Sequence, residues 1–149
     1  DDFSLAPGVR NAFGLVGSAA NAVAPGKRPL SSMSPTIVID ERENLRLTCG
    51  AAGGPKIITA VLQTLVRTID LGQPIDVALS SPRVHHQWSP DTLAYEEALP
   101  AEVSEELGRM GHKLERGKTL AVAQGIERLA SGELVAASDP RVPSSAAAT

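Results

Sequence analysis

The sequence lacks most of the features that mark specialised classes of protein. It contains a single cysteine, Cys49, and aromatic residues make up only 3% of its 149 residues. One cysteine excludes an internal disulfide and a cysteine-rich zinc site. No apolar run approaches the roughly 20 residues that a membrane-spanning helix needs. The 14 basic and 17 acidic residues leave no excess of positive charge of the kind that binds nucleic acid.

The remaining composition is that of an ordinary globular domain, with 42% hydrophobic residues and enough length for a buried core. Residues 1–33 are rich in proline and glycine and have no sustained helical or strand period. A segment this long is unusual as a simple connection between elements of a compact domain, so we expect a functional loop region there. We expect an α/β core over residues 34–141 and a disordered tail over the small, polar residues 142–149.

Hydrophobic periodicity predicts an α+β fold in which helices pack on a largely antiparallel sheet. Helices are expected at 55–71, 74–80 and 102–110, and β-hairpins from 35–39 with 45–49 and from 121–127 with 134–138. A weaker strand pattern covers 84–88.

Hydroxyl side chains gather just before the first predicted strand. Ser31, Ser32 and Ser34 lie between Pro29 and Pro35, and the two prolines restrict the backbone on either side. Adjacent hydroxyls and backbone amides can hold a carboxylate through several hydrogen bonds. The simpler interpretation is a serine-rich turn. No nucleophile-elbow motif surrounds these serines, which disfavours a serine nucleophile.

A run of small residues, Gly50-Ala51-Ala52-Gly53-Gly54, lies between a predicted strand and a predicted helix. Small residues let a ligand approach the backbone, and N–H groups at a helix start favour an anion or a developing oxyanion. The run matches neither the phosphate-binding loop nor the dinucleotide fingerprint. A tight strand-to-helix turn is an equally good interpretation.

The chain begins Asp1-Asp2-Phe3-Ser4, without an initiator methionine or a signal peptide, so we expect it to be a piece of a longer protein. The simplest interpretation of Asp2 is an exposed acidic terminus. The functional alternative is that its carboxylate pairs with an amino group of a ligand.

Other reactive side chains carry weaker predictions. His85 and His86 are adjacent, so in a strand their rings point to opposite faces and cannot share a metal ion. Cys49 ends a predicted buried strand, where thiols are usually inert packing residues. Trp88 is expected to fill the core rather than to stack on a ligand.

Several segments occur in the order found in gamma-glutamyltransferases. The longest is Lys27–Thr36, with the sequence Lys-Arg-Pro-Leu-Ser-Ser-Met-Ser-Pro-Thr. The match also includes Asp1–Ser4, Gly53-Gly54, Pro82–Trp88 and Ser138–Arg141. The chain therefore resembles this family over nearly its whole length.

The resemblance implies part of an N-terminal-nucleophile hydrolase, an αββα sandwich formed by a large and a small subunit after self-cleavage. In such enzymes the N-terminal threonine of the small subunit attacks the γ-glutamyl amide of glutathione. The resulting γ-glutamyl-enzyme is hydrolysed by water or passes its acyl group to an amino acid or peptide. The resemblance implies no metal or organic cofactor, and a periplasmic or extracellular location.

Carried over position by position, Asp2 is expected to bind the α-amino group of the γ-glutamyl moiety, and Ser31 and Ser32 its α-carboxylate. The amides of Gly53 and Gly54 are expected to form the oxyanion hole. The family's catalytic threonine lies before the Asp-Asp-Phe block, and no threonine of this chain matches it. We therefore expect a C-terminal part of the small subunit that is inactive alone, self-associates, and requires the large subunit and the missing N-terminal part of the small subunit.

Two alternatives remain open. One is an acylase of the same family that acts on glutaryl-type cephalosporin side chains; glutaryl lacks the α-amino group that Asp2 would bind. The other is a non-catalytic binding module that retains the glutamyl pocket. One departure from the family, Gly50-Ala51-Ala52 in place of the usual Ser-Pro before the glycine pair, leaves the shape of this loop open.

Overall fold

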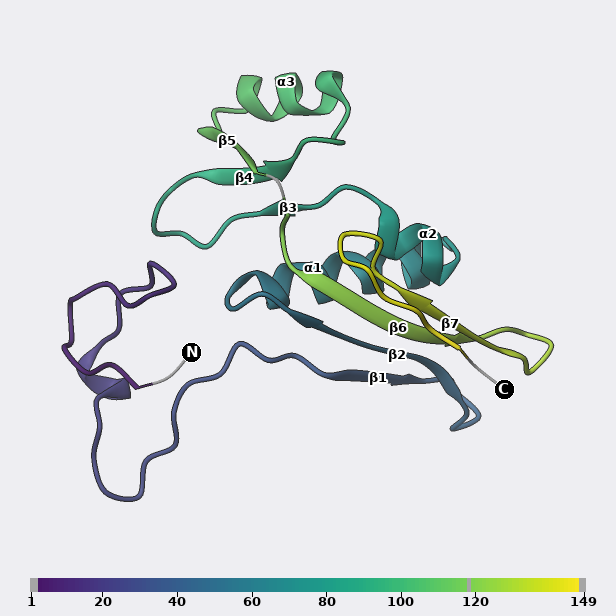
Figure 1. Cartoon of the computed structure of the whole chain (residues 1–149), viewed down its shortest axis with the longest axis horizontal. Helices are drawn as coiled ribbons and strands as arrows, with labels where there is room; N and C mark the ends of the chain where they lie inside the picture. Colours follow the sequence, from purple (N-terminus) through teal and green to yellow (C-terminus); the bar gives the residue numbers. More distant parts are fainter. Residues whose placement is uncertain (1–2, 118, 148–149) are drawn as a thin grey trace.

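The computed structural model describes residues 3–117 and 119–147, and it confirms the α+β class (Figure 1). Residues 3–33 contain one short 3₁₀ turn, η1, and otherwise follow an irregular path. The elements in chain order are η1 (Ala19–Asn21), β1 (Thr36–Ile39), β2 (Leu45–Ala52), α1 (Lys56–Leu65), η2 (Val66–Asp70), α2 (Ile75–Ser80), β3 (Val84–His85), β4 (Leu93–Glu96), α3 (Ala101–Arg109), β5 (Leu114–Gly117), β6 (Val122–Arg128) and β7 (Leu134–Ser138).

The larger sheet is fully antiparallel and has the strand order β1-β2-β6-β7. The predicted hairpins β1–β2 and β6–β7 are therefore confirmed, and β2 extends three residues beyond the predicted end at Cys49. Helices α1 and α2 cover one face of this sheet (Figure 1). Alternate residues of β2 face these helices, because successive strand side chains point to opposite faces. Leu47 and Cys49 are accordingly buried, whereas Arg46 is exposed.

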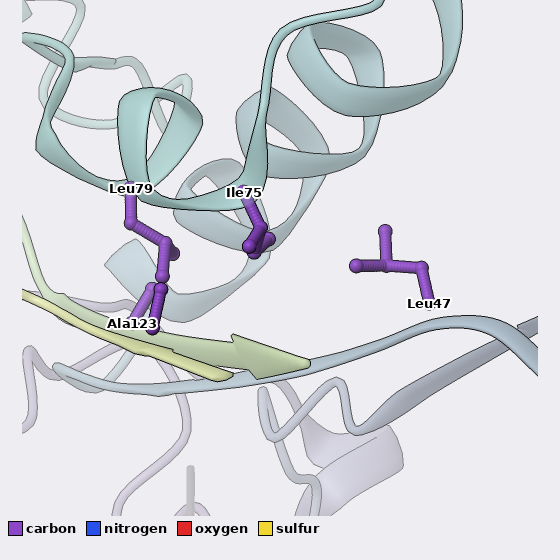
Figure 2. Packing of buried hydrophobic residues seen from close by; sticks show 5 residues of the cluster. Leu47, Ile75, Leu79 and Ala123 are labelled. Carbon is purple, nitrogen blue, oxygen red and sulfur yellow. The ribbon is translucent and has the colours of Figure 1, made fainter. Parts of the chain in front are cut away.

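The main core lies between α2 and the larger sheet. Leu47, Ile75, Leu79 and Ala123 are at most 1% exposed, and Figure 2 shows their side chains converging between helix and strands. The carboxylate of Glu127 on β6 accepts the N–H of Ile75 at 3.0 Å. Ile75 is the first residue of α2, so the sheet supplies an acceptor for an N–H that the helix itself leaves unpaired.

The helix predicted at 55–71 begins and ends close to its expected limits, but it is not uniform. Regular α-helix stops at Leu65, and the last turn, η2, is a π-helix. Gly72 follows with a φ of +63°, a backbone conformation that suits glycine at a helix end.

A second, smaller sheet has the order β3-β4-β5 and carries α3 (Figure 1). The pattern over 84–88 yields only the two-residue strand β3, which pairs with β4. Periodicity missed β4 and β5, because each is a four-residue strand without a clear alternation. They pair in parallel, with α3 as the connection that parallel neighbours require.

The prediction that Trp88 fills the core is wrong. Its side chain is 82% exposed. Pairing of β3 ends at His85, so Trp88 lies in the loop between β3 and β4, outside the sheet, where no element covers it. Its φ of +69° belongs to a turn rather than to a strand.

Candidate active site

The serine segment and the glycine pair lie at the same end of the larger sheet. In the antiparallel register of β1 and β2, Thr36 is the partner of Cys49. The start of β1 and the end of β2 therefore meet at one edge. Ser31 and Ser32 precede that start, and Gly53 and Gly54 follow that end.

The glycine pair adopts a conformation that other residues rarely take. Gly53 has a φ of +147° and Gly54 a φ of +59°. A Cβ atom on Gly53 would lie 2.7 Å from the Cβ of Ala121, and one on Gly54 would lie 2.8 Å from the ring of Phe13. Both backbone strain and close neighbours therefore require glycine at these positions.

Within residues 3–117 and 119–147, the carbonyls of the glycine pair accept hydrogen bonds and its N–H groups donate none. Gly53 and Gly54 accept the N–H groups of Lys56 and Ile57 at 3.3 and 3.1 Å, which attaches the loop to the first turn of α1. Neither glycine N–H has an acceptor among the described residues. Two donors held at a helix start are suited to stabilising an oxyanion.

The serine segment is ordered by its own hydrogen bonds. Ser31 is exposed, and its Oγ accepts the N–H of Met33 at 3.1 Å. Ser32 is 8% exposed. The hydroxyl of Ser34 donates to the carbonyl of Ser32 at 3.1 Å. Asp2, the third expected binding residue, lies outside the described residues.

A cluster of four charged side chains, of which Arg83, Glu96 and Asp139 are buried, joins the two sheets. Arg83 contacts Asp139 at 2.8 Å, and Arg141 contacts the other carboxylate oxygen of Asp139 at 3.0 Å. Arg141 also pairs with Glu96, to which its Nε donates at 2.7 Å. Arg83 and Asp139 are no more than 1% exposed. Burial of paired charges is tolerated here because each carboxylate accepts several hydrogen bonds.

The charged cluster positions the chain segment that contacts Gly53. Glu96 accepts the N–H of Leu120 at 2.8 Å, and Arg83 donates to the carbonyl of Ala121 at 3.1 Å. Ala121, with a φ of +71°, is the residue against which Gly53 packs. The cluster thus holds in place the residue that packs against Gly53.

Hydrogen bonds lower the pKa values of the two acidic residues of the cluster by more than burial raises them. Burial alone would raise their pKa values, but the pKa of Glu96 is lowered by bonds from Arg141 and from backbone N–H groups. The pKa of Asp139 is lowered by the N–H groups of Ala123 and Arg141 and by both guanidinium groups. Burial and the neighbouring Arg141 lower the pKa of Arg83. The two acids are therefore ionised at neutral pH.

Sequence reasoning did not assign a role to this cluster. Arg83, Asp139 and Arg141 belong to the segments Pro82–Trp88 and Ser138–Arg141, which match the family. The residue pattern alone offers no physical reason for the presence of these charged residues there. Glu96 had no signal, since it belongs to a strand that the pattern missed.

The remaining reactive residues lie apart from the glycine pair or are engaged in local contacts. Cys49 is buried, and burial raises the pKa of its thiol. His85 is buried and contacts the hydroxyl of Thr59 at 2.8 Å, whereas His86 contacts Asp91 at 3.0 Å. Over residues 3–117 and 119–147, no group of three or more His, Cys, Asp or Glu side chains could hold a metal ion. No helix of the same residues is long and apolar enough to cross a membrane.

Comparison with protein families and curated proteins identifies relatives along the whole chain. The family model described as Gamma-glutamyltranspeptidase matches residues 1–149. The chain is 48% identical over 141 residues to the Glutathione hydrolase proenzyme of Escherichia coli (strain K12), in an alignment that covers 95% of this chain and 24% of that protein. The chain spans about a quarter of the length of this relative and of the Glutathione hydrolase proenzyme of Pseudomonas aeruginosa.

Solved structures support the same relationship. An acivicin-inhibited gamma-glutamyltranspeptidase has a TM-score of 0.89 and 42% identity, covering 95% of this chain and 77% of that chain. A cephalosporin acylase from Bacillus halodurans has a TM-score of 0.74 and 26% identity, covering 81% of this chain and 23% of that chain. The α+β fold described above is therefore that of N-terminal-nucleophile hydrolases.

Proposed function

The chain belongs to the gamma-glutamyltranspeptidase family, and from this premise we propose that it forms part of an enzyme that hydrolyses glutathione and transfers γ-glutamyl groups. Its contribution is the oxyanion hole and most of the glutamyl-binding site. The observation that carries the proposal is the pair of N–H groups on Gly53 and Gly54, which have no acceptor in the described part of the chain and are held in a strained loop at the start of α1.

The binding site follows from the charges of a γ-glutamyl group. Ser31 and Ser32 hold its α-carboxylate, since hydroxyl donors bind an anion well. Asp2 holds the α-ammonium group. The two serines lie at the same edge of the sheet as the glycine pair. This supports the assignment, because one glutamyl group has to contact the serines through its α-carboxylate and the glycines through its γ-carbonyl oxygen. Residues 3–33 form the loop region beside this site, with Phe13 over Gly54.

The proposed chemistry has two steps. A threonine hydroxyl attacks the γ-carbonyl carbon, the C–N bond breaks, and the departing amine takes a proton. Water or an incoming amine then attacks the ester, the C–O bond to the enzyme breaks, and the proton returns to the threonine oxygen. Gly53 and Gly54 stabilise the negative oxygen in both steps.

The nucleophile comes from outside the 149 residues of this chain, since none of its threonines matches the family's N-terminal threonine. We therefore expect the chain alone to form no covalent intermediate. It acts with the large subunit and the remainder of the small subunit, in the periplasm or outside the cell.

The outer face of the larger sheet is the surface on which those partners would pack. Ile37 is 72% and Ile39 is 61% exposed on β1, and in Figure 1 the helices lie on the opposite face. An uncovered apolar sheet face favours association. The isolated chain is accordingly expected to self-associate, and sedimentation across a wide concentration range tests this. A monodisperse monomer would contradict it.

Release of chromophore from a γ-glutamyl anilide tests the proposed function. The full-length protein is expected to release it, whereas the 149-residue chain is not. Replacing Ser31 or Ser32 by alanine in the full-length protein should lower kcat/KM about tenfold or more, the effect of losing a hydrogen bond to a charged group. Ser80→Ala is the matched control, since Ser80 is an exposed residue of α2 whose hydroxyl donates to the carbonyl of Val77 in the same helix. Turnover by the chain alone would instead identify Ser31 or Ser32 as a nucleophile.

A glutaryl acylase is the second candidate, and the similarity to a cephalosporin acylase favours testing it. Glutaryl lacks the α-ammonium group, so Asp2→Ala should impair cleavage of a γ-glutamyl anilide and leave cleavage of a glutaryl anilide unchanged. Efficient release only from the glutaryl anilide would favour the acylase. Binding of γ-glutamyl compounds without release of either chromophore would indicate a binding module.

A further inference from the structure

The outer side of helix α1 is apolar. The exposed residues of this helix are Ile58 and Leu62, at 51% and 55% exposed, and the next residue of the same row, Val66, is 39% exposed. The three lie four residues apart, so they form one ridge along the helix. A helix that faces water on its outer side carries polar residues there. The ridge is therefore expected to contact another segment of protein.

The contacts of α1 within the chain lie on its other sides. Its buried residues pack on β2 and β6. On the row beside the ridge, Gln63 donates to the carbonyl of Val84 at 2.8 Å and Arg67 donates to that of Pro82 at 2.9 Å. These bonds attach one flank of α1 to β3 and to the segment before it. The ridge itself remains exposed in the described part of the chain.

Arg67 is a half-buried cation at the C-terminal end of the ridge. It forms no ion pair with any described residue. Burial and the neighbouring Arg83 and Arg141 lower the pKa of its guanidinium. Those two arginines already share the carboxylates of Glu96 and Asp139. A carboxylate from outside the described residues would offset the repulsion among the three cations.

The relatives contain a chain large enough to supply this contact. The present chain covers 24% of the Escherichia coli proenzyme but 77% of the matching chain in the acivicin-inhibited structure. Most residues of such a protein therefore lie outside the chain that matches. The outer face of the larger sheet accounts for one contact with that remainder, and α1 lies on the opposite face (Figure 1).

We propose that the ridge of Ile58, Leu62 and Val66 is the docking surface for a helix of the large subunit. This inference rests on the proposed function, in which the chain acts together with that subunit. Side chains four residues apart form a ridge that fits the groove between two rows of a second helix. The docking helix carries apolar residues along that groove and an aspartate or glutamate that pairs with Arg67. The large subunit thereby covers the helix layer as well as the sheet.

Protection of an introduced thiol tests whether the ridge is covered. Leu62→Cys in the matured full-length enzyme is treated with a maleimide, and mass spectrometry measures labelling of the peptide that contains the new thiol. Labelling should be about tenfold or more slower than in Glu105→Cys, because a covered thiol reacts only upon local opening. Glu105 is the matched control, since it is an exposed residue of α3. Equal labelling rates in the two variants would overturn the proposal.

A carbodiimide cross-link tests which segment covers the ridge. Arg67→Lys retains the positive charge and supplies a primary amine, which a carbodiimide joins to a carboxylate in direct contact with it. The expected product links this position to an aspartate or glutamate of the large subunit. The unsubstituted enzyme is the control, since its guanidinium does not form this link. A link to a second copy of this chain, or no link, would overturn the proposal.

Neither readout depends on turnover. Absence of chromophore release from a γ-glutamyl anilide by the unsubstituted full-length protein would overturn the proposed function, whereas free labelling of Leu62→Cys in an active enzyme would overturn only the docking surface. The two failures are therefore distinguishable.

Discussion

The substitution Asp139→Asn removes one negative charge from the buried cluster that joins the two sheets. Arg83 and Arg141 balance Glu96 and Asp139 at present, so the variant would leave the cluster with one uncompensated positive charge. Asp139 accepts the N–H of Ala123 at 2.8 Å and that of Arg141 at 3.0 Å, besides its contacts with both guanidinium groups. An asparagine of the same shape would turn one acceptor oxygen into a donor facing other donors.

The expected loss of stability is about 3–5 kcal/mol, the usual cost of removing one partner from a buried ion pair. With a urea dependence of about 2 kcal/mol per M, this lowers the unfolding midpoint by about 2 M. Circular dichroism at a fixed protein concentration measures the shift. The control is Glu97→Gln, which breaks the surface pair with Arg116, whose side chains are 71% and 58% exposed, and should cost less than about 1 kcal/mol.

Acid is expected to remove the contribution of this cluster to the free energy of unfolding, because proton binding and unfolding are linked. The pKa values of Glu96 and Asp139 are lowered in the folded chain, so the unfolded chain binds protons more readily. The contribution of the two carboxylates to the free energy of unfolding is therefore complete above their pKa values in the unfolded chain, about 4. It is lost as the pH falls through their lower pKa values in the folded chain. Asp139→Asn should show a shallower loss of stability below about pH 4. An unchanged slope, or a midpoint equal to that of Glu97→Gln, would refute this account of the cluster.

The remaining predictions concern the core. Leu47→Ala should lower the free energy of unfolding in urea by about 2–5 kcal/mol, because Leu47 is 0% exposed and packs with Ile75 and Leu79. The control Ile58→Ala, at a half-exposed position of α1, should cost far less. Equal losses in the two variants would contradict the assigned core. Cys49 should react with a thiol reagent only upon unfolding, since it is 6% exposed and burial raises the pKa of its thiol; rapid labelling of the folded chain would argue against this placement.

Local pattern was sufficient for the elements of the larger sheet and its helices. Strands β1, β2, β6 and β7 alternate or carry β-branched residues, and α1 repeats its apolar residues at helical spacing, so their periods are visible in the sequence. The same local information indicated the glycine pair and the serine segment as candidate positions, because glycine and serine have distinctive backbone and hydrogen-bonding chemistry.

Local pattern failed in the smaller sheet. The four-residue strands β4 and β5 are defined by their parallel pairing across α3, which is a long-range contact. Trp88 is the clearest example, since its size favoured a core position, but the short pairing of β3 leaves it in an exposed loop.

The sequence by itself determined the family and the α+β class, and it indicated the serine segment and the glycine pair as candidate positions, because these depend on residue identity and short periodicities. Only the tertiary structure decided how the site is assembled. The register of β1 against β2 brings Ser32 and Gly53 to one edge, and the pairing of Arg83 with Asp139 fixes Ala121 against Gly53. Residues so far apart in the chain meet only when the sheet and the buried charges are formed together, and no local propensity encodes that meeting.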